Sequence, residues 1–157
     1  METIKEAAMT KKSNSSVIDQ MQGLLADTYV LYLKTQNYHW NVTGPNFSGL
    51  HLLFEQQYSE LAQAVDAIAE RIRSCGSYAD GSFKTFLSRA SIDEETGHPN
   101  AQEMLRRLAA DNRQLAEIAS TLQKNAEAEG DLGSADLAAG RISLHEKAAW
   151  MLEASID

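Results

Sequence analysis

The stretch CGSYADGSFKTFLSRASIDEETGH, residues 75–98, mixes glycine, serine and acidic residues and interrupts the helical pattern of the chain. A direct connection between two neighbouring antiparallel helices needs only a few residues, so a connection of this length predicts a crossover. One short helical turn is expected within it, near Phe83 to Leu87. The helices on either side of the stretch therefore form two separate hairpins.

Apolar residues recur at three-four spacing on both sides of the crossover, which is typical of amphipathic helices. Each of the two prolines, Pro45 and Pro99, stands where a helix can begin. Ser134 is expected to be the N-cap of the last helix. The expected helices run from about Ser16 to Tyr38, from about Asn46 to Ser74, from near Pro99 toward Gly130, and from near Ser134 to the end.

The connections between these helices are short, long and short. This order favours an all-α, ferritin-like four-helix bundle with one long crossover carrying a short helix, rather than a bundle with three tight loops. We expect residues 16–157 to form this one domain and residues 1–15 to be a flexible tail.

Composition limits the function. The formal net charge is −8, which disfavours a default nucleic-acid binder and suits cations. A single cysteine, Cys75, excludes an internal disulfide framework and fits a reducing cytosol. We find neither a run of 18 apolar residues nor a signal-peptide pattern, so the sequence predicts a cytoplasmic protein that does not span a membrane.

The second predicted helix carries an unusual set of polar residues on one face. His51, Glu55, Asp66 and Glu70 are separated by 4, 11 and 4 residues. At about 100° per residue they fall within an arc of roughly 100°. At about 1.5 Å per residue, however, His51 and Asp66 lie about 22 Å apart along the helix, too far to share one metal ion. One chain cannot close such a site.

A second copy of the chain solves this problem. If it lies antiparallel across a two-fold axis, the His51 and Glu55 end of one helix faces the Asp66 and Glu70 end of the other, which gives two equivalent sites per dimer. His39, level with His51 across the hairpin, completes a set of two imidazoles and three carboxylates suited to Fe(II). A bound cation also offsets the repulsion between Asp66 and Glu70.

Simpler interpretations stay open for single residues. His51 with Glu55, and Glu70 with Arg73, also fit ordinary contacts on a helix surface.

Four further residues are given structural roles. His98 and His145 are expected to be surface or structural residues, and Trp40 and Trp150 to be core or interface aromatics. The only Glu-x-x-His motif, Glu95 to His98, lies in the crossover, so the intrachain di-iron site of an ordinary ferritin is not expected.

Two stretches resemble the Dps family of miniferritins, the DNA-binding proteins from starved cells. They are HWNVTGPNFSGLHLLFEQQYSELAQAVDAIAERI, residues 39–72, and GDLGSADLAAGRISLHEKAAWMLEAS, residues 130–155. The resemblance implies a hollow dodecamer that oxidises Fe(II), preferably with hydrogen peroxide, stores ferric mineral and so protects DNA. It also implies two iron positions at each site between two copies, with zinc as a substitute metal.

Carried over by motif position, the family's ferroxidase ligands fall on His39, His51, Asp66 and Glu70. Glu55 departs from the common pattern, which has Asp there. Trp40 matches an aromatic residue that absorbs stray oxidising equivalents in the family.

Three further expectations complete the prediction. Asp131 and Asp136 are candidates for acidic openings through which Fe(II) enters. The alternative function is a nucleoid-associated protein that compacts DNA, but Lys5, Lys11 and Lys12 make only a weak basic arm, so any DNA binding is expected to be weak. A third alternative is an oligomeric scaffold without a redox role.

Overall fold

The described part of the chain consists of helices and the loops that connect them. The computed structural model describes the side chains of residues 16–157, and the flexible tail expected over residues 1–15 lies outside these fully described residues. The helices are α1 (Glu2–Asn41), α2 (Phe47–Ser74), α3 (Phe83–Arg89), α4 (Ala101–Ala128) and α5 (Leu132–Glu153).

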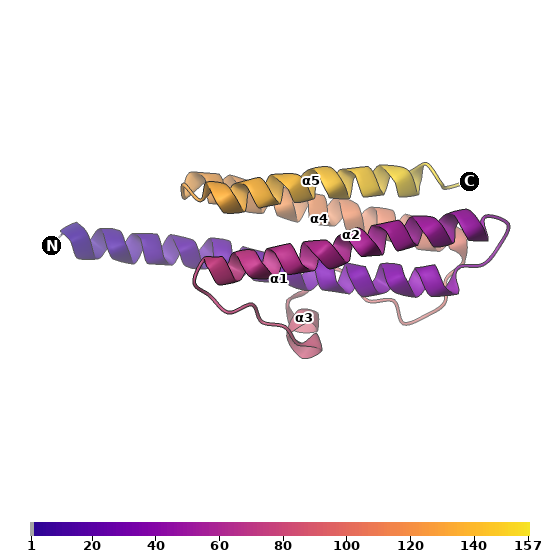
Figure 1. Ribbon diagram of the computed structural model, residues 1–157, viewed down its shortest axis with the longest axis horizontal. Coiled ribbons are helices and arrows are strands. Elements are labelled where there is room, and N and C mark those ends of the chain that lie inside the picture. Colours follow the sequence, from indigo (N-terminus) through magenta and orange to yellow (C-terminus); the bar gives the residue numbers. More distant parts are fainter. Residues whose placement is uncertain (1) are drawn as a thin grey trace.

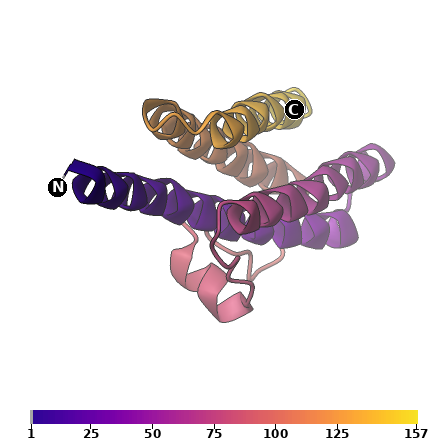
Figure 2. The same ribbon diagram turned by 60° about the vertical axis from the view of Figure 1, so that its left-hand side comes forward.

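The four long helices form two antiparallel hairpins. Figure 1 shows α1 beside α2 and α4 beside α5, with the short α3 set against the outer side of the first hairpin. Figure 2 shows that the second hairpin lies across the first at an angle. The backbones of α1 and α4 approach closely, whereas α2 and α5 lie farther apart and meet through side chains. The predicted four-helix bundle with one long crossover is confirmed.

Helix starts follow local capping chemistry. The side chain of Asn100 accepts a hydrogen bond from the Glu103 N–H at 2.9 Å, so α4 begins two residues after Pro99. At α5 the expected cap was wrong. Asp131 is the N-cap, because its carboxylate accepts from the Ser134 N–H at 3.1 Å, and Ser134 itself is buried one turn inside the helix.

The apolar stripes predicted for the first three long helices largely line the core. Met21, Phe54, Ile68, Leu105 and Leu115 are all fully buried. Burying apolar side chains of this size is the main driving force that holds the two hairpins together.

The buried face of α5 differs from the prediction. Leu144 is 42% exposed, and of the predicted stripe only Leu152 is buried. The other buried residues are Ser134, Ala135, Ala138, Arg141, His145 and Ala149.

Polar side chains of α1 fasten the crossover to the bundle. Asp27, which is buried, accepts hydrogen bonds from the Ser91 N–H at 2.6 Å and the Ile92 N–H at 3.2 Å. The Lys34 ammonium donates to the Asp93 carbonyl at 2.8 Å and pairs with Asp111 at 2.8 Å. Burial raises the pKa of Asp111, and the Lys34 charge opposes that rise. These contacts fix a long loop that has little helical structure of its own.

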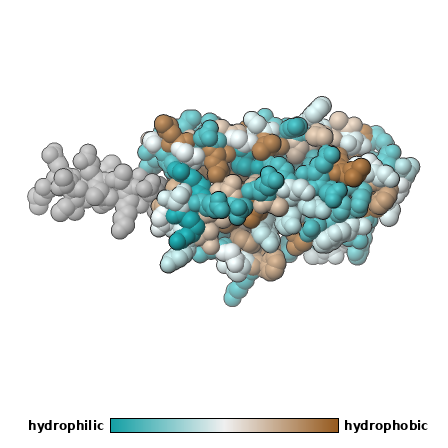
Figure 3. Space-filling view, in the orientation of Figure 1, coloured by the Kyte–Doolittle hydropathy of each residue, from teal (hydrophilic) through white to brown (hydrophobic). Residues whose placement is uncertain are grey.

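The surface carries mixed side chains. Figure 3 shows hydrophobic side chains in separate patches among hydrophilic ones on one face of the bundle. Trp40 and Trp150 are exposed by 60% and 61%, so neither is a core residue. Among the described residues, no helix combines the length and the apolar character needed to cross a membrane.

Candidate metal centre

The tight turn between α1 and α2 brings two histidines together. His39 lies in the last turn of α1, and His51 lies near the start of α2. Gly44 occupies the turn with φ of +114°, a backbone conformation that glycine adopts readily. The two imidazole rings stack with centroids 3.8 Å apart and planes 13° from parallel. The predicted pairing of His39 with His51 is therefore present within one chain.

Each histidine is fixed by the backbone of the other. The His39 Nδ1 lies 2.7 Å from the His51 carbonyl oxygen, and the His51 Nδ1 lies 2.7 Å from the His39 carbonyl oxygen. A carbonyl oxygen only accepts, so both Nδ1 atoms carry the proton and donate it. Both Nε2 atoms therefore keep a lone pair. Orientation of a ring through its other nitrogen is the usual arrangement for a histidine that binds a metal ion.

Three carboxylates lie exposed on α2, as the spacing predicted. Glu55, Asp66 and Glu70 belong to its solvent-facing side, and within residues 16–157 none of them forms an ion pair.

The simpler surface contacts considered for these residues are absent from the described part of the chain. Arg73 lies over the Tyr78 ring at 4.7 Å instead of pairing with Glu70, and His51 uses its Nδ1 for the His39 carbonyl. The carboxylates are thus free to bind a cation.

The five candidate ligands do not converge within one copy. Among residues 16–157, no three His, Cys, Asp or Glu side chains come close enough together to hold a metal ion. His39 and His51 form one cluster, and Asp66 and Glu70 lie farther along the same helix. The candidate ligands therefore form separate groups within one chain.

Aromatic side chains surround the histidine pair. Phe47 stacks on the His51 ring at a centroid distance of 5.0 Å, and Tyr58 meets the His39 ring edge-on at 5.1 Å. His39 is only 8% exposed. These contacts limit rotation of the imidazoles and hold them at the edge of the core.

The Glu-x-x-His motif of the crossover is not a metal site within one chain. Glu95 accepts hydrogen bonds from the Tyr38 hydroxyl and the Arg107 guanidinium, while His98 is exposed. The Tyr38 hydrogen bond is the main reason that the pKa of Glu95 falls to about 2, and burial raises the pKa of Tyr38. Glu95 thus serves to hold the crossover against α1 and α4.

A buried polar network was missed by the sequence reasoning. Arg141 of α5 forms an ion pair with Glu60 of α2 and donates from Nη2 to the His145 Nε2 at 3.1 Å. The His145 Nδ1 lies 2.9 Å from the Asn112 side-chain oxygen, to which it donates. Burial, together with the Arg141 charge, lowers the pKa of His145 to about 3. His145 is therefore a structural residue, one of the two roles expected for it.

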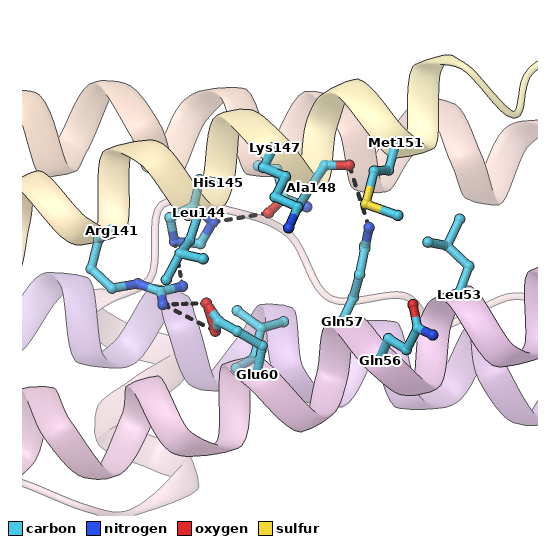
Figure 4. Close-up of a pocket in the computed structure, with 12 residues that line it drawn as sticks. Leu53, Gln56, Gln57, Glu60, Arg141, Leu144, His145, Lys147, Ala148 and Met151 are labelled. Carbon is cyan, nitrogen blue, oxygen red and sulfur yellow. Dashed lines mark hydrogen bonds and ion pairs between the residues drawn. The ribbon is translucent and has the colours of Figure 1, made fainter.

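This network closes one end of a groove between α2 and α5. Figure 4 shows Arg141 and Glu60 pointing toward each other across it, with Leu53 and Met151 at the other end. The groove has a volume of about 210 Å³. The signal in the sequence was Arg141 and His145 at i,i+4 spacing within an alanine-rich helix, a pattern that places both side chains on the inward face.

The two acidic residues considered for an iron entrance differ in their environment. Asp131 forms an ion pair with Arg71 at 2.7 Å in addition to capping α5. Burial disfavours its charged form, but the hydrogen bonds from Ser134 and the Arg71 charge outweigh burial and lower its pKa. Asp136 is exposed. Asp131 therefore has a structural role within the chain.

The fold is that of a ferritin-like protein, and comparison with known proteins agrees. The family model of the ferritin-like domain matches residues 18–157. The DNA protection during starvation protein of Brevibacillus brevis is 37% identical over 133 residues, which cover 85% of this chain and 89% of that protein. An uncharacterised low temperature-induced protein of Nostoc sp. is 38% identical over 151 residues, which cover 95% of this chain and 84% of that protein. The chain belongs to the Dps family.

Solved structures show the same relationship. The Dps protein from Bacillus brevis superposes with a TM-score of 0.89 and 35% identity, covering 91% of this chain and 96% of that one. The Dps protein from Vibrio cholerae O1 is described as a member of the ferritin-like diiron-carboxylate proteins. It superposes with a TM-score of 0.87 and 31% identity, and the match covers 91% of this chain and 90% of that one.

Proposed function

We propose that this protein is a miniferritin that oxidises Fe(II), preferably with hydrogen peroxide, at sites formed between two antiparallel copies, and stores ferric mineral inside a hollow dodecamer. The observation that carries the proposal is the reciprocal bonding of His39 and His51, which engages the Nδ1 of each stacked ring and leaves the Nε2 of each ring available to a metal ion. Two imidazoles with nearby carboxylates suit Fe(II). The diiron-carboxylate description of the Vibrio cholerae relative supports the same chemistry.

A second copy completes each site. The His39, His51 and Glu55 cluster of one chain faces Asp66 and Glu70 of the other, which brings five ligands to a site with two iron positions. Trp40 and Leu52, which follow the two histidines in sequence, are exposed by 60% and 56% in the single chain. Covering such apolar side chains favours association at this face. Zn²⁺ also accepts imidazole and carboxylate ligands and is expected to compete with iron.

The residues act mainly by position and charge. Three carboxylates per site attract two Fe(II) ions, and the fixed imidazoles hold them near peroxide. Two Fe(II) ions each give one electron, and hydrogen peroxide takes both electrons and two protons to become two water molecules. Because the peroxide bond is cleaved by an electron pair, no hydroxyl radical is released. Removing iron and peroxide together protects DNA chemically, in keeping with the name of the Brevibacillus brevis relative.

A complementation experiment tests the shared site. His51→Ala and Asp66→Ala each damage both sites of a homodimer, so each protein is expected to lose peroxide-dependent Fe(II) oxidation. When the two variants are co-expressed, about half of the dimers are mixed, and each mixed dimer has one intact site of two. Shells that contain both variants are therefore expected to regain about a quarter of the wild-type rate.

Two results would contradict the proposal. One is no recovery in the mixed shells, since a site held within one chain cannot be complemented. The other is undiminished oxidation in either single variant. Native mass of each variant serves as the control, because loss of assembly would also remove activity.

DNA compaction is not favoured by the described residues. The basic side chains on which that alternative rests lie within residues 1–15, and the net charge of −8 opposes binding to phosphate. A gel shift at near-physiological salt is expected to show free DNA.

A further inference from the structure

A continuous row of tyrosine rings leads away from the histidine pair. The Tyr58 ring meets the His39 ring at a centroid distance of 5.1 Å. Tyr32 follows at 6.0 Å from Tyr58, and Tyr29 at 5.8 Å from Tyr32. Each of these contacts is edge-on, with planes 68° to 76° apart. Every step lies within the usual range for interacting aromatic rings.

The row changes chemistry at its far end. Beyond Tyr29 the next rings are Phe86, stacked at 4.8 Å, and Phe83, edge-on at 6.1 Å, both from α3. A phenol loses an electron and a proton far more readily than an unsubstituted phenyl ring. The oxidisable rings therefore begin at the candidate metal ligand and stop at Tyr29. Packing alone does not require this order, because Phe fills nearly the same space as Tyr.

We propose that Tyr58, Tyr32 and Tyr29 form a relay that carries a single oxidising equivalent away from the iron site. The relay rests on the proposed function, because iron and peroxide supply the oxidant. It acts when only one Fe(II) ion meets peroxide, so that the electron pair needed for complete reduction is not available. It thereby protects His39 and His51, the groups closest to the reaction.

The chemistry balances at each step. One Fe(II) and one hydrogen peroxide give Fe(III), hydroxide and a hydroxyl radical. The radical takes a hydrogen atom from the Tyr58 hydroxyl and becomes water, which leaves a phenoxyl radical on Tyr58. Tyr32 then gives an electron and a proton to Tyr58, and Tyr29 gives the same to Tyr32. The phenoxyl radical on Tyr29 is reduced by an electron from a further Fe(II) and a proton from water.

The end of the relay lies at a cavity. Tyr29, Trp40 and Glu94 are among the residues that line it, and its volume is about 370 Å³. The carboxylate of Glu94 offers a local attraction for the Fe(II) that returns Tyr29 to its resting state. The oxidising equivalent is therefore discharged at a second place and not at the ligands.

Tyr32→Phe interrupts the row at its centre while keeping the ring. The assembled protein is given less than one Fe(II) per site, followed by hydrogen peroxide, and oxygen addition to each tyrosine is measured by peptide mass spectrometry. In the wild type we expect oxidation at Tyr29. In Tyr32→Phe we expect that oxidation to be lost and oxidation of Tyr58 to rise, with the initial rate of Fe(II) oxidation unchanged.

Tyr78→Phe is the matched control. Tyr78 is 77% exposed and packs against Arg73, outside the row, so this change should leave the oxidation of Tyr29 as it is. In Tyr32→Phe, Tyr78 itself reports hydroxyl radicals that escape into solution. Equal oxidation of Tyr29 with and without Tyr32 would overturn the relay, because it would mean direct attack by diffusing radicals.

His51→Ala separates failure of the relay from failure of the proposed function. If Fe(II) oxidation is lost in His51→Ala but Tyr29 is oxidised equally in Tyr32→Phe and the wild type, the relay alone is wrong. If Fe(II) oxidation is the same in His51→Ala, the proposed function is wrong, and the relay loses its oxidant with it.

Discussion

Two regions of this molecule hold buried or half-buried histidines, and they use the ring nitrogens differently. At the α1–α2 turn, the Nδ1 atoms of His39 and His51 each donate to a backbone carbonyl, and neither Nε2 has a hydrogen-bond partner among residues 16–157. Between α4 and α5, His145 engages both nitrogens, one with Asn112 and one with Arg141. The second nitrogen therefore distinguishes a candidate ligand from a residue that holds helices together.

The electrostatic surroundings follow the same division. Near the histidine pair, Glu55 is exposed and forms no ion pair among the described residues, so its negative charge favours a cation. Around His145, the Arg141 guanidinium adds positive charge, which disfavours both protonation and a metal ion. The charged groups next to each histidine therefore suit a candidate ligand in one region and a structural residue in the other.

The largest expected effect comes from His39→Gln. The glutamine amide can still donate to the His51 carbonyl, but the Nε2 lone pair is lost. We expect Fe(II) oxidation by peroxide to fall about 100-fold, with stability changed by less than about 1 kcal/mol. Stopped-flow absorbance and urea denaturation measure the two quantities. His98→Gln, which changes an exposed histidine of the crossover, is expected to leave both unchanged.

His145→Ala should give the reverse pattern. It removes the partner of the Asn112 side-chain oxygen and of the Arg141 Nη2 and opens a cavity, while the Arg141–Glu60 ion pair remains, so the free energy of unfolding is expected to fall by about 2–4 kcal/mol. The rate of iron oxidation per folded protein should stay as it is. Denaturation must be compared at one protein concentration, because assembly adds to stability. A loss below about 1 kcal/mol would show that the network is not a structural element.

Lowering the pH should reduce the stability of the protein through the buried His145. The pKa of His145 is about 3 in the folded chain, against a usual value near 6.5. Between these values the unfolded chain binds a proton that the folded chain does not, so the free energy of unfolding falls as the pH falls from about 6.5 toward 3. Thermal unfolding midpoints across this range should decline less steeply in His145→Asn. An unchanged slope would mean that other groups dominate.

The smallest effect is expected at Glu55. Aspartate has the same charge on a shorter arm, so Glu55→Asp should change the oxidation rate by less than about threefold. Glu55→Gln removes the charge and should cost about tenfold. If both variants retain the full rate, Glu55 is not a ligand, and the open half-site contains His39 and His51 alone.

Much of the fold could be predicted because its signals are local. The long loop of residues 75–98 and the spacing of Met21, Phe54 and Leu105 depend only on helix geometry and turn composition. The buried stripe of α5 could not be predicted in the same way. Apart from Leu152, its inward face carries small residues with Arg141 and His145, and Leu144 points outward, so the usual polarity of an amphipathic helix is weak there.

The candidate site was also only partly accessible from sequence. The common face of His51, Glu55, Asp66 and Glu70 follows from helix periodicity. The exchange of hydrogen bonds between His39 and His51 depends on the exact approach of two helices and has no pattern in the sequence. The row of Tyr58, Tyr32 and Tyr29 joins residues from two helices, so three-dimensional packing is needed to reveal it.

The bonds that fix His39 and His51 are made by the protein alone, between residues only 12 positions apart in the sequence. Such a local contact forms early and cheaply, because little chain entropy is lost in closing a short loop. For the proposed storage of ferric mineral, this means that the histidine pair is in place before any iron arrives. Binding and release of iron would then require no refolding of the turn.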